Sequence, residues 1–134
     1  MRFVGRLLVA AVCLAALSLA GNPQQDTKGK DTVEGYVIDS SCAYTKNLDK
    51  PVSAACARSC AKAGSPLVIL TADGAVYWPI SGSVPATSQN QKLMPFAGEK
   101  VAVSGKVFER KGSKAIVIEK IERVASSKPA ATTH

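Results

Sequence analysis

The sequence of 134 residues has a single histidine, His134, at its last position. Without a histidine in the body of the chain, a Ser-His-Asp triad or a Cys-His pair has no base. The sequence also has no C-x-x-C motif and no glycine-rich phosphate loop. Its body aspartates Asp39, Asp49 and Asp73 stand apart from one another, and only Asp39 precedes a cysteine segment. These absences predict a protein that is not an enzyme.

Long hydrophobic runs are missing except at the start of the chain. Residues 1–20 have the pattern of a secretory signal peptide, with Arg2 and Arg6 before an apolar run over 7–17 and small residues at 18–20. The run is shorter than the ~20 residues that a membrane-spanning helix needs. We therefore expect cleavage after about Ala20, loss of Cys13 with the leader, and a periplasmic or secreted protein without a transmembrane segment.

The polar composition of both ends sets the boundaries of the domain. Residues 21–31 are nearly all polar and predict a disordered tether, residues 126–134 predict a disordered tail, and 32–125 remain for one domain. Removing Arg2 and Arg6 leaves 15 basic residues against 10 acidic ones, so the mature chain carries +5. This bias fits a lysine-rich soluble surface, and it also favours contact with anionic envelope components.

Alternating apolar residues predict five strands, over residues 32–39, 67–71, 75–80, 100–109 and 115–124. Asp73-Gly74 predicts a hairpin turn between the second and third strands. Gly35 within the first strand indicates a bulge or tight bend. A change of phase near Glu119 and Lys120 predicts a bulge in the last strand. On the third strand, Trp78 is expected in the core.

One helix is predicted over residues 54–63, because Ser53 is a suitable N-cap, the segment is rich in alanine, and Gly64 can end it. Cys56 and Cys60 are one turn apart, and we expect their shared face to point inward. Residues 41–52 are expected as loop. Residues 81–98 are expected as a loop with at most one short helical turn, which places Leu93 and Phe96 over one end of the sheet.

Five strands of this length are most economically closed into a barrel, which leaves no long exposed edge. The predicted class is mainly β, an antiparallel five-stranded OB-like small barrel with one short helix between strands 1 and 2. An open, doubly wound parallel sheet fits poorly, because no βαβ unit recurs along the chain.

Three segments carry a resemblance to an uncharacterised family of small exported bacterial proteins. They are residues 35–42 (GYVIDSSC), 56–64 (CARSCAKAG) and 97–107 (AGEKVAVSGKV). The resemblance implies an OB barrel and brings no known reaction. That family often has a histidine three residues before the first helical cysteine, where this chain has Ser53, so a role for that histidine does not carry over.

The three cysteines of the predicted mature chain are Cys42, Cys56 and Cys60. In an oxidising compartment the default is a disulfide. Cys56 and Cys60 are one helical turn apart and poorly spaced for a bridge. Cys42 bridged to Cys56 or Cys60 closes a loop whose stabilisation is roughly 3 kcal/mol. Either pairing leaves one thiol over, which permits a disulfide-linked dimer.

Two alternatives use the same residues. Convergence of the three cysteines, with Asp39 as a fourth ligand, would suit Cu(I) or Zn(II). A redox-active disulfide with the third cysteine as its resolving thiol is the other alternative. The spacing C-x13-C-x3-C matches no standard zinc motif.

A nucleic-acid site on the barrel would use Tyr77, Trp78, Arg110, Lys111 and Lys114. Export argues against it, and adjacent aromatic residues of one strand point to opposite faces. The sequence thus predicts a non-enzymatic binding or structural module of the cell envelope, and it does not identify the ligand or partner.

Overall fold

The computed structural model describes residues 30–125, so the predicted signal peptide, nearly all of the predicted tether and the predicted tail lie outside the described residues. All five expected strands are present, each within about two residues of its predicted bounds. The elements in chain order are β1 (Asp31–Asp39), α1 (Ser40–Thr45), α2 (Ala54–Lys62), β2 (Leu67–Leu70), β3 (Val76–Ile80), α3 (Asn90–Leu93), η1 (Met94–Phe96), β4 (Lys100–Arg110) and β5 (Ser113–Arg123).

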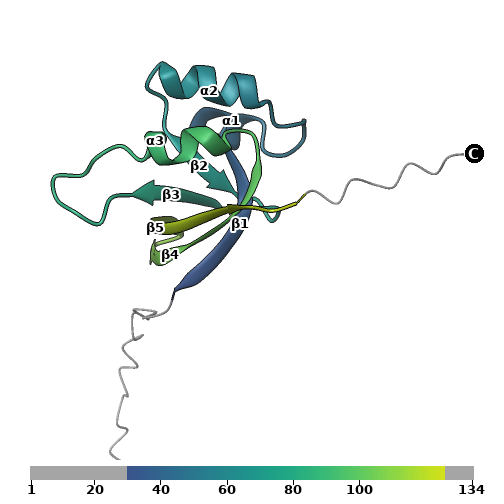
Figure 1. Ribbon diagram of the computed structural model, residues 1–134. Coiled ribbons are helices and arrows are strands. Elements are labelled where there is room, and N and C mark those ends of the chain that lie inside the picture. Colours follow the sequence, from purple (N-terminus) through teal and green to yellow (C-terminus); the bar gives the residue numbers. More distant parts are fainter. Residues whose placement is uncertain (1–29, 126–134) are drawn as a thin grey trace, which may run out of the picture.

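The strands form a closed barrel in the order β1-β2-β3-β5-β4, with β1 also paired to β4. The mainly β, OB-like fold class is therefore confirmed. All pairs are antiparallel except β3 with β5, which run parallel. The expectation of a wholly antiparallel barrel was wrong at this pair, because the long connection after β3 carries the chain across before β4 begins. Figure 1 shows the three helices gathered at one end of the strands.

The long first strand pairs with two neighbours, and Gly35 lies next to the residue where the pairing changes. Its first half pairs with β4 and its second half with β2, and both pairings include Tyr36. A Cβ atom on Gly35 would lie only 2.6 Å from the carbonyl oxygen of Leu70. Glycine at this position therefore permits the close approach of β1 to β2.

The last strand contains the predicted bulge. Ser104 pairs with Lys120 and Gly105 pairs with Ile118, so Glu119 is an extra residue on β5. A Cβ atom on Gly105 would lie 2.0 Å from a backbone oxygen of β5. The bulge moves the apolar side chains on its two sides onto the same inner face, which explains the change of phase in the sequence.

Alternate residues of the strands supply two separate hydrophobic clusters. On β2, Leu67 and Ile69 point into the barrel, whereas Val68 and Leu70 point outward, and all four are buried. The interior cluster comprises Val33, Val37, Ala57, Ala61, Leu67, Ile69, Leu93, Ala97, Val101, Val103, Ile116 and Ile118. The outer cluster comprises Ile38, Ala43, Val68 and Leu70, with Cys42, Leu48, Val52, Val76 and Trp78 packed against it.

The helices close the barrel. Ala57 and Ala61 of α2 and Leu93 of α3 belong to the interior cluster, so the predicted short turn does place Leu93 over the barrel. The side chain of Asn90 accepts a hydrogen bond from the amide of Leu67 at 2.9 Å and donates to a backbone oxygen, which attaches α3 to the start of β2. No helix within residues 30–125 is both long enough and apolar enough to cross a membrane.

Helix α1 lies in a segment that was predicted to be loop. It begins at Ser40 because the carboxylate of Asp39 accepts the backbone hydrogen bond of Cys42 at 3.0 Å, as an N-cap residue does. The helix covers the outward face of the first strands. Its exposed Tyr44 stacks on half-buried Trp78, with ring centroids 6.4 Å apart, so Trp78 belongs to the outer cluster and not to the barrel interior.

Candidate functional site

The three cysteines lie on α1 and α2, and two of them line the same cavity. Cys42 lies in the first turn of α1, Cys56 in the first turn of α2, and Cys60 one turn further along α2. Cys42 and Cys56 line one cavity of about 60 Å³ between the two helices. The cavity wall also includes Asp39 and two lysines from the connecting loop, Lys46 and Lys50. The tertiary structure therefore gathers residues that are up to 17 positions apart in the sequence.

The face of α2 that points inward is not the cysteine face, so that expectation was wrong. Ala57 and Ala61 are 2% and 7% exposed and pack into the barrel, whereas Cys56 is exposed and Cys60 is half-buried. The small alanines let the helix approach the barrel end closely. The cysteines are consequently placed at the edge of this contact, where solvent reaches Cys56.

Two sulfurs of α2 lie near each other without a bond. Cys56 and Cys60 are 4.2 Å apart, and within residues 30–125 all three cysteines are free thiols. Side chains one helical turn apart have Cβ atoms about 5–6 Å from each other, whereas a disulfide needs about 3.8 Å. This geometry agrees with the expectation that Cys56 and Cys60 are poorly placed to bridge. The pairing of Cys42 with either of them stays a prediction.

Asp39 is buried, with 2% of its surface exposed, and both of its carboxylate oxygens are engaged. One accepts the amide hydrogen of Cys42 at 3.0 Å, and the other accepts the hydroxyl hydrogen of Ser65. The amide of Ser40 donates to the carbonyl oxygen of Pro66 at 2.9 Å. Asp39 therefore joins the start of α1 to the segment that enters β2, which is a structural role.

Burial and nearby charge act on two of the thiols. Loss of solvent raises the pKa of the Cys42 thiol above its ordinary value, Lys46 opposes this shift, and Asp39 adds to it. Loss of solvent and then Asp39 also raise the pKa of Cys60, and a hydrogen bond with Cys56 contributes. Both thiols are thus more firmly held in the neutral form, which slows their attack on other sulfurs.

The residues proposed as metal ligands do not form a coordination site in this arrangement. Among residues 30–125, no group of three histidine, cysteine, aspartate or glutamate side chains is placed to hold a metal ion. The oxygens of Asp39 already accept hydrogen bonds, and Cys56 opens to solvent. The expectation of Cu(I) or Zn at Cys42, Cys56, Cys60 and Asp39 stays a prediction.

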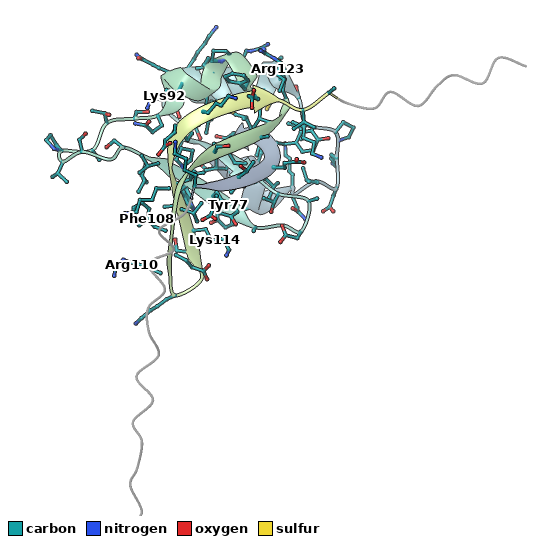
Figure 2. The ribbon with its side chains drawn as sticks, turned by 60° about the horizontal axis from the view of Figure 1, so that its bottom comes forward. Tyr77, Lys92, Phe108, Arg110, Lys114 and Arg123 are labelled. Atoms are coloured by element: carbon teal, nitrogen blue, oxygen red, sulfur yellow. The ribbon has the colours of Figure 1, made fainter. Side chains whose placement is uncertain are left out.

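The aromatic residues considered for nucleic acid lie on different sides of the barrel wall, as expected. Tyr77 packs against the interior cluster, with the ammonium of Lys114 5.8 Å from its ring centroid, and Trp78 belongs to the outer cluster. Lys114 is also paired with Glu109 at 2.7 Å. Exposed Arg110 is the last residue of β4, where Figure 2 labels it, and exposed Lys111 follows it in the hairpin turn. These residues do not form one stacking platform.

Sequence reasoning missed two features of the surface. Phe108 faces outward with the ammonium of Lys106 4.8 Å from its ring centroid, and Ala115 separates it from Trp78 in the strand register. Lys46, on the cavity wall, follows Cys42 by four residues. A helix predicted over residues 40–45 would have placed Cys42 and Lys46 on one face, because residues four apart are neighbours on a helix.

A larger groove of about 640 Å³ lies at the start of β4 and the end of β5, with Tyr36, Lys100 and Arg123 in its wall. Arg123 forms an ion pair with Glu99, and it donates a hydrogen bond to the carbonyl oxygen of Pro95 at 3.0 Å. Lys100 lies 3.5 Å from a carboxylate of Glu34. The charges of this groove therefore neutralise one another, and it supplies no distinct chemistry.

Comparison of the chain with protein-family models, with curated proteins and with solved structures finds no match. The function must therefore be argued from the residues of the site and from the predicted export.

Proposed function

We propose that this protein is an exported, non-enzymatic OB-like module of the cell envelope, with a binding or structural role. A disulfide from Cys42 to Cys56 or Cys60 staples its helical cap. The observation that carries the proposal is the cavity of about 60 Å³, because thiols from two different helices, Cys42 and Cys56, both line it. Of the two pairings, the one between Cys42 and Cys56 is favoured by this cavity.

The physical effect of such a bond would be to hold α1 over the outer cluster. Helix α1 has six residues, which is too short to be stable by itself. A bond that closes a loop of about 15 residues contributes roughly 3 kcal/mol in the chain-entropy model. The disulfide would thus stabilise α1 and the outer cluster that this short helix covers.

Mass spectrometry of the protein isolated from the periplasm or medium tests this proposal. Alkylation before reduction, followed by peptide mapping, should give one bridge that includes Cys42 and one alkylated thiol on α2. Three alkylated thiols in a protein without metal would contradict the staple. A chain that keeps residues 1–20 and stays inside the cell would contradict export.

A second candidate is a periplasmic thiol-redox or metal-binding protein that uses Cys42, Cys56 and Cys60. The distance of 4.2 Å between Cys56 and Cys60 favours the redox form, since a third thiol lies next to the sulfur that would take part in the bond. Three free thiols together with a stoichiometric metal ion would support the metal-binding form. A band of twice the monomer mass in a non-reducing gel, lost on reduction, would show a dimer through the odd cysteine.

A further inference from the structure

We propose that Cys56 is the thiol at which this protein reacts with an external anionic disulfide, and that Cys42 then resolves the mixed disulfide to form the staple. The inference rests on the proposed staple for its final product. It adds the order of the steps, the class of co-reactant, and the role of the cavity lysines.

Exposure and position single out Cys56 as the first thiol to react. It is exposed, whereas Cys42 and Cys60 are half-buried. It also lies in the first turn of α2, where the hydroxyl of Ser53 accepts its amide hydrogen at 3.2 Å. Access to solvent therefore favours attack by Cys56 over attack by the two half-buried thiols.

The position of Cys42 suits the second step. Cys42 lines the same cavity of about 60 Å³ as Cys56, and it is half-buried there. An external disulfide therefore reaches exposed Cys56 more readily than Cys42, and Cys42 lies on the wall of the cavity that Cys56 also lines. Cys60 is close to Cys56, but a bridge between them requires the helix to distort, because the Cβ separation of about 5–6 Å exceeds the usual 3.8 Å. Cys42 is thus the resolving thiol.

The lysines of the cavity wall determine which disulfides react well. Lys46 and Lys50 are exposed, and neither is in an ion pair within residues 30–125. The two lysines outnumber the one carboxylate of this cavity wall, Asp39, so the wall attracts a disulfide that carries carboxylates and repels one that carries amines. Glutathione disulfide has the favourable charge, and cystamine has the unfavourable one.

The reaction is two consecutive exchanges. The Cys56 thiolate attacks one sulfur of glutathione disulfide, a bond forms between Cys56 and glutathione, and one glutathione leaves as a thiolate that takes up a proton. The Cys42 thiolate then attacks the Cys56 sulfur, the bond from Cys42 to Cys56 forms, and the second glutathione leaves. Two protein thiols are oxidised, one glutathione disulfide is reduced to two glutathiones, and Cys60 stays a thiol.

The test uses the full-length chain with Cys13→Ser, reduced and then exposed briefly to glutathione disulfide, with acid quenching and peptide mapping. With Cys42→Ser added, we expect at least about fivefold more glutathione on Cys56 than on Cys60, because Cys56 is exposed and Cys60 is half-buried. With Cys60→Ser added, we expect the bond from Cys42 to Cys56 and two glutathiones released. With Cys56→Ser, the initial reaction should slow about tenfold.

Two controls separate the inference from the chemistry of thiols in general. In guanidinium chloride the three cysteines should react at rates within about twofold, since the ordering depends on the fold. In the folded protein, glutathione disulfide should react faster than cystamine, and Lys46→Ala with Lys50→Ala should remove most of that preference. Lys62→Ala, an exposed lysine at the other end of α2, should leave it unchanged.

Modification mainly at Cys60 or Cys42 in the folded protein would overturn the inference, and so would equal rates with the two reagents. Accumulation of the mixed disulfide at Cys56 without a bond to Cys42 would overturn the resolving step. The proposed staple has a separate failure: it fails if the protein isolated from cells has no bridge, whatever the order of reactivity in the reduced chain.

Discussion

The two hydrophobic clusters of this protein differ in how they are enclosed. The interior cluster has twelve buried residues, contributed by four strands and by the helices that close the barrel, and it is surrounded by paired backbone. The outer cluster has four, and its cover is the six-residue α1 with the loop after it. The interior cluster is therefore held by strand pairing on all sides and by the helices at one end, whereas the outer cluster depends on a few attachments at the start of α1.

The adjacent residues Ile69 and Leu70 give the strongest test, because both are fully buried on β2 and they face opposite clusters. We expect Ile69→Ala to lower the free energy of unfolding by about 4 kcal/mol and Leu70→Ala by about 2, since the loop cover of the outer cluster can collapse into the space. Urea denaturation of both variants measures this. Equal losses would remove the proposed difference between the clusters.

The staple should act on the outer cluster alone. Reduction of the oxidised protein, or Cys42→Ser, should lower the free energy of unfolding by roughly 3 kcal/mol, as expected for a loop of this length. Hydrogen exchange should quicken in α1 and remain slow in β4 and β5. Cys60→Ser serves as the matched control and should keep the stability of the oxidised protein. Faster exchange throughout the barrel would show that the two regions are not independent.

Loss of the cap residue Asp39 should lower the free energy of unfolding by less than loss of the disulfide, and by more than changes at neighbouring residues. Asp39→Ala removes the acceptor for the amide of Cys42 and the partner of the Ser65 hydroxyl, which should cost about 2 kcal/mol in the reduced protein. Asp39→Asn should cost less, because it keeps an oxygen acceptor. Exposed Ser41→Ala is the control and should change stability by less than about 0.5 kcal/mol. A neutral Asp39→Ala result would mean that α1 is held by packing alone.

The smallest effect concerns pH. The folded state raises the pKa of Cys42 above its ordinary value of 9.0, so the unfolded chain releases this proton first as the pH rises. The contribution of Cys42 to the free energy of unfolding is fully present below pH 9 and is lost as the pH rises toward the folded pKa. The reduced protein should therefore lose stability above about pH 9, and Cys42→Ser should make this loss of unfolding free energy with pH less steep. An unchanged slope would show that burial of this thiol is too slight to matter.

Most of the barrel was predictable from residue patterns. Alternation located the five strands, Asp73-Gly74 marked the hairpin, and the phase change near Glu119 marked the bulge. The N-cap Ser53 located α2. These signals are local, because side-chain period, positive φ and capping each depend on a few consecutive residues.

The candidate site was predictable in its members and not in its geometry. Helix α1 was missed because its start depends on Asp39 and on a hydroxyl from Ser65, 26 residues away in sequence. The inward face of α2 was misjudged, since alanine and cysteine are both small enough to pack there. Only the contact of α2 with the barrel end shows that Ala57 and Ala61 fill that position.

Composition and short-range pattern were enough to locate the strands and the main helix, and to single out Cys42, Cys56 and Cys60 as the unusual chemistry. The parallel pairing of β3 with β5, the division into two clusters, and the cavity lined by Cys42 and Cys56 became visible only in the folded chain. Those features depend on which distant surfaces pack together, and packing is set by the sum of many contacts and not by any one segment.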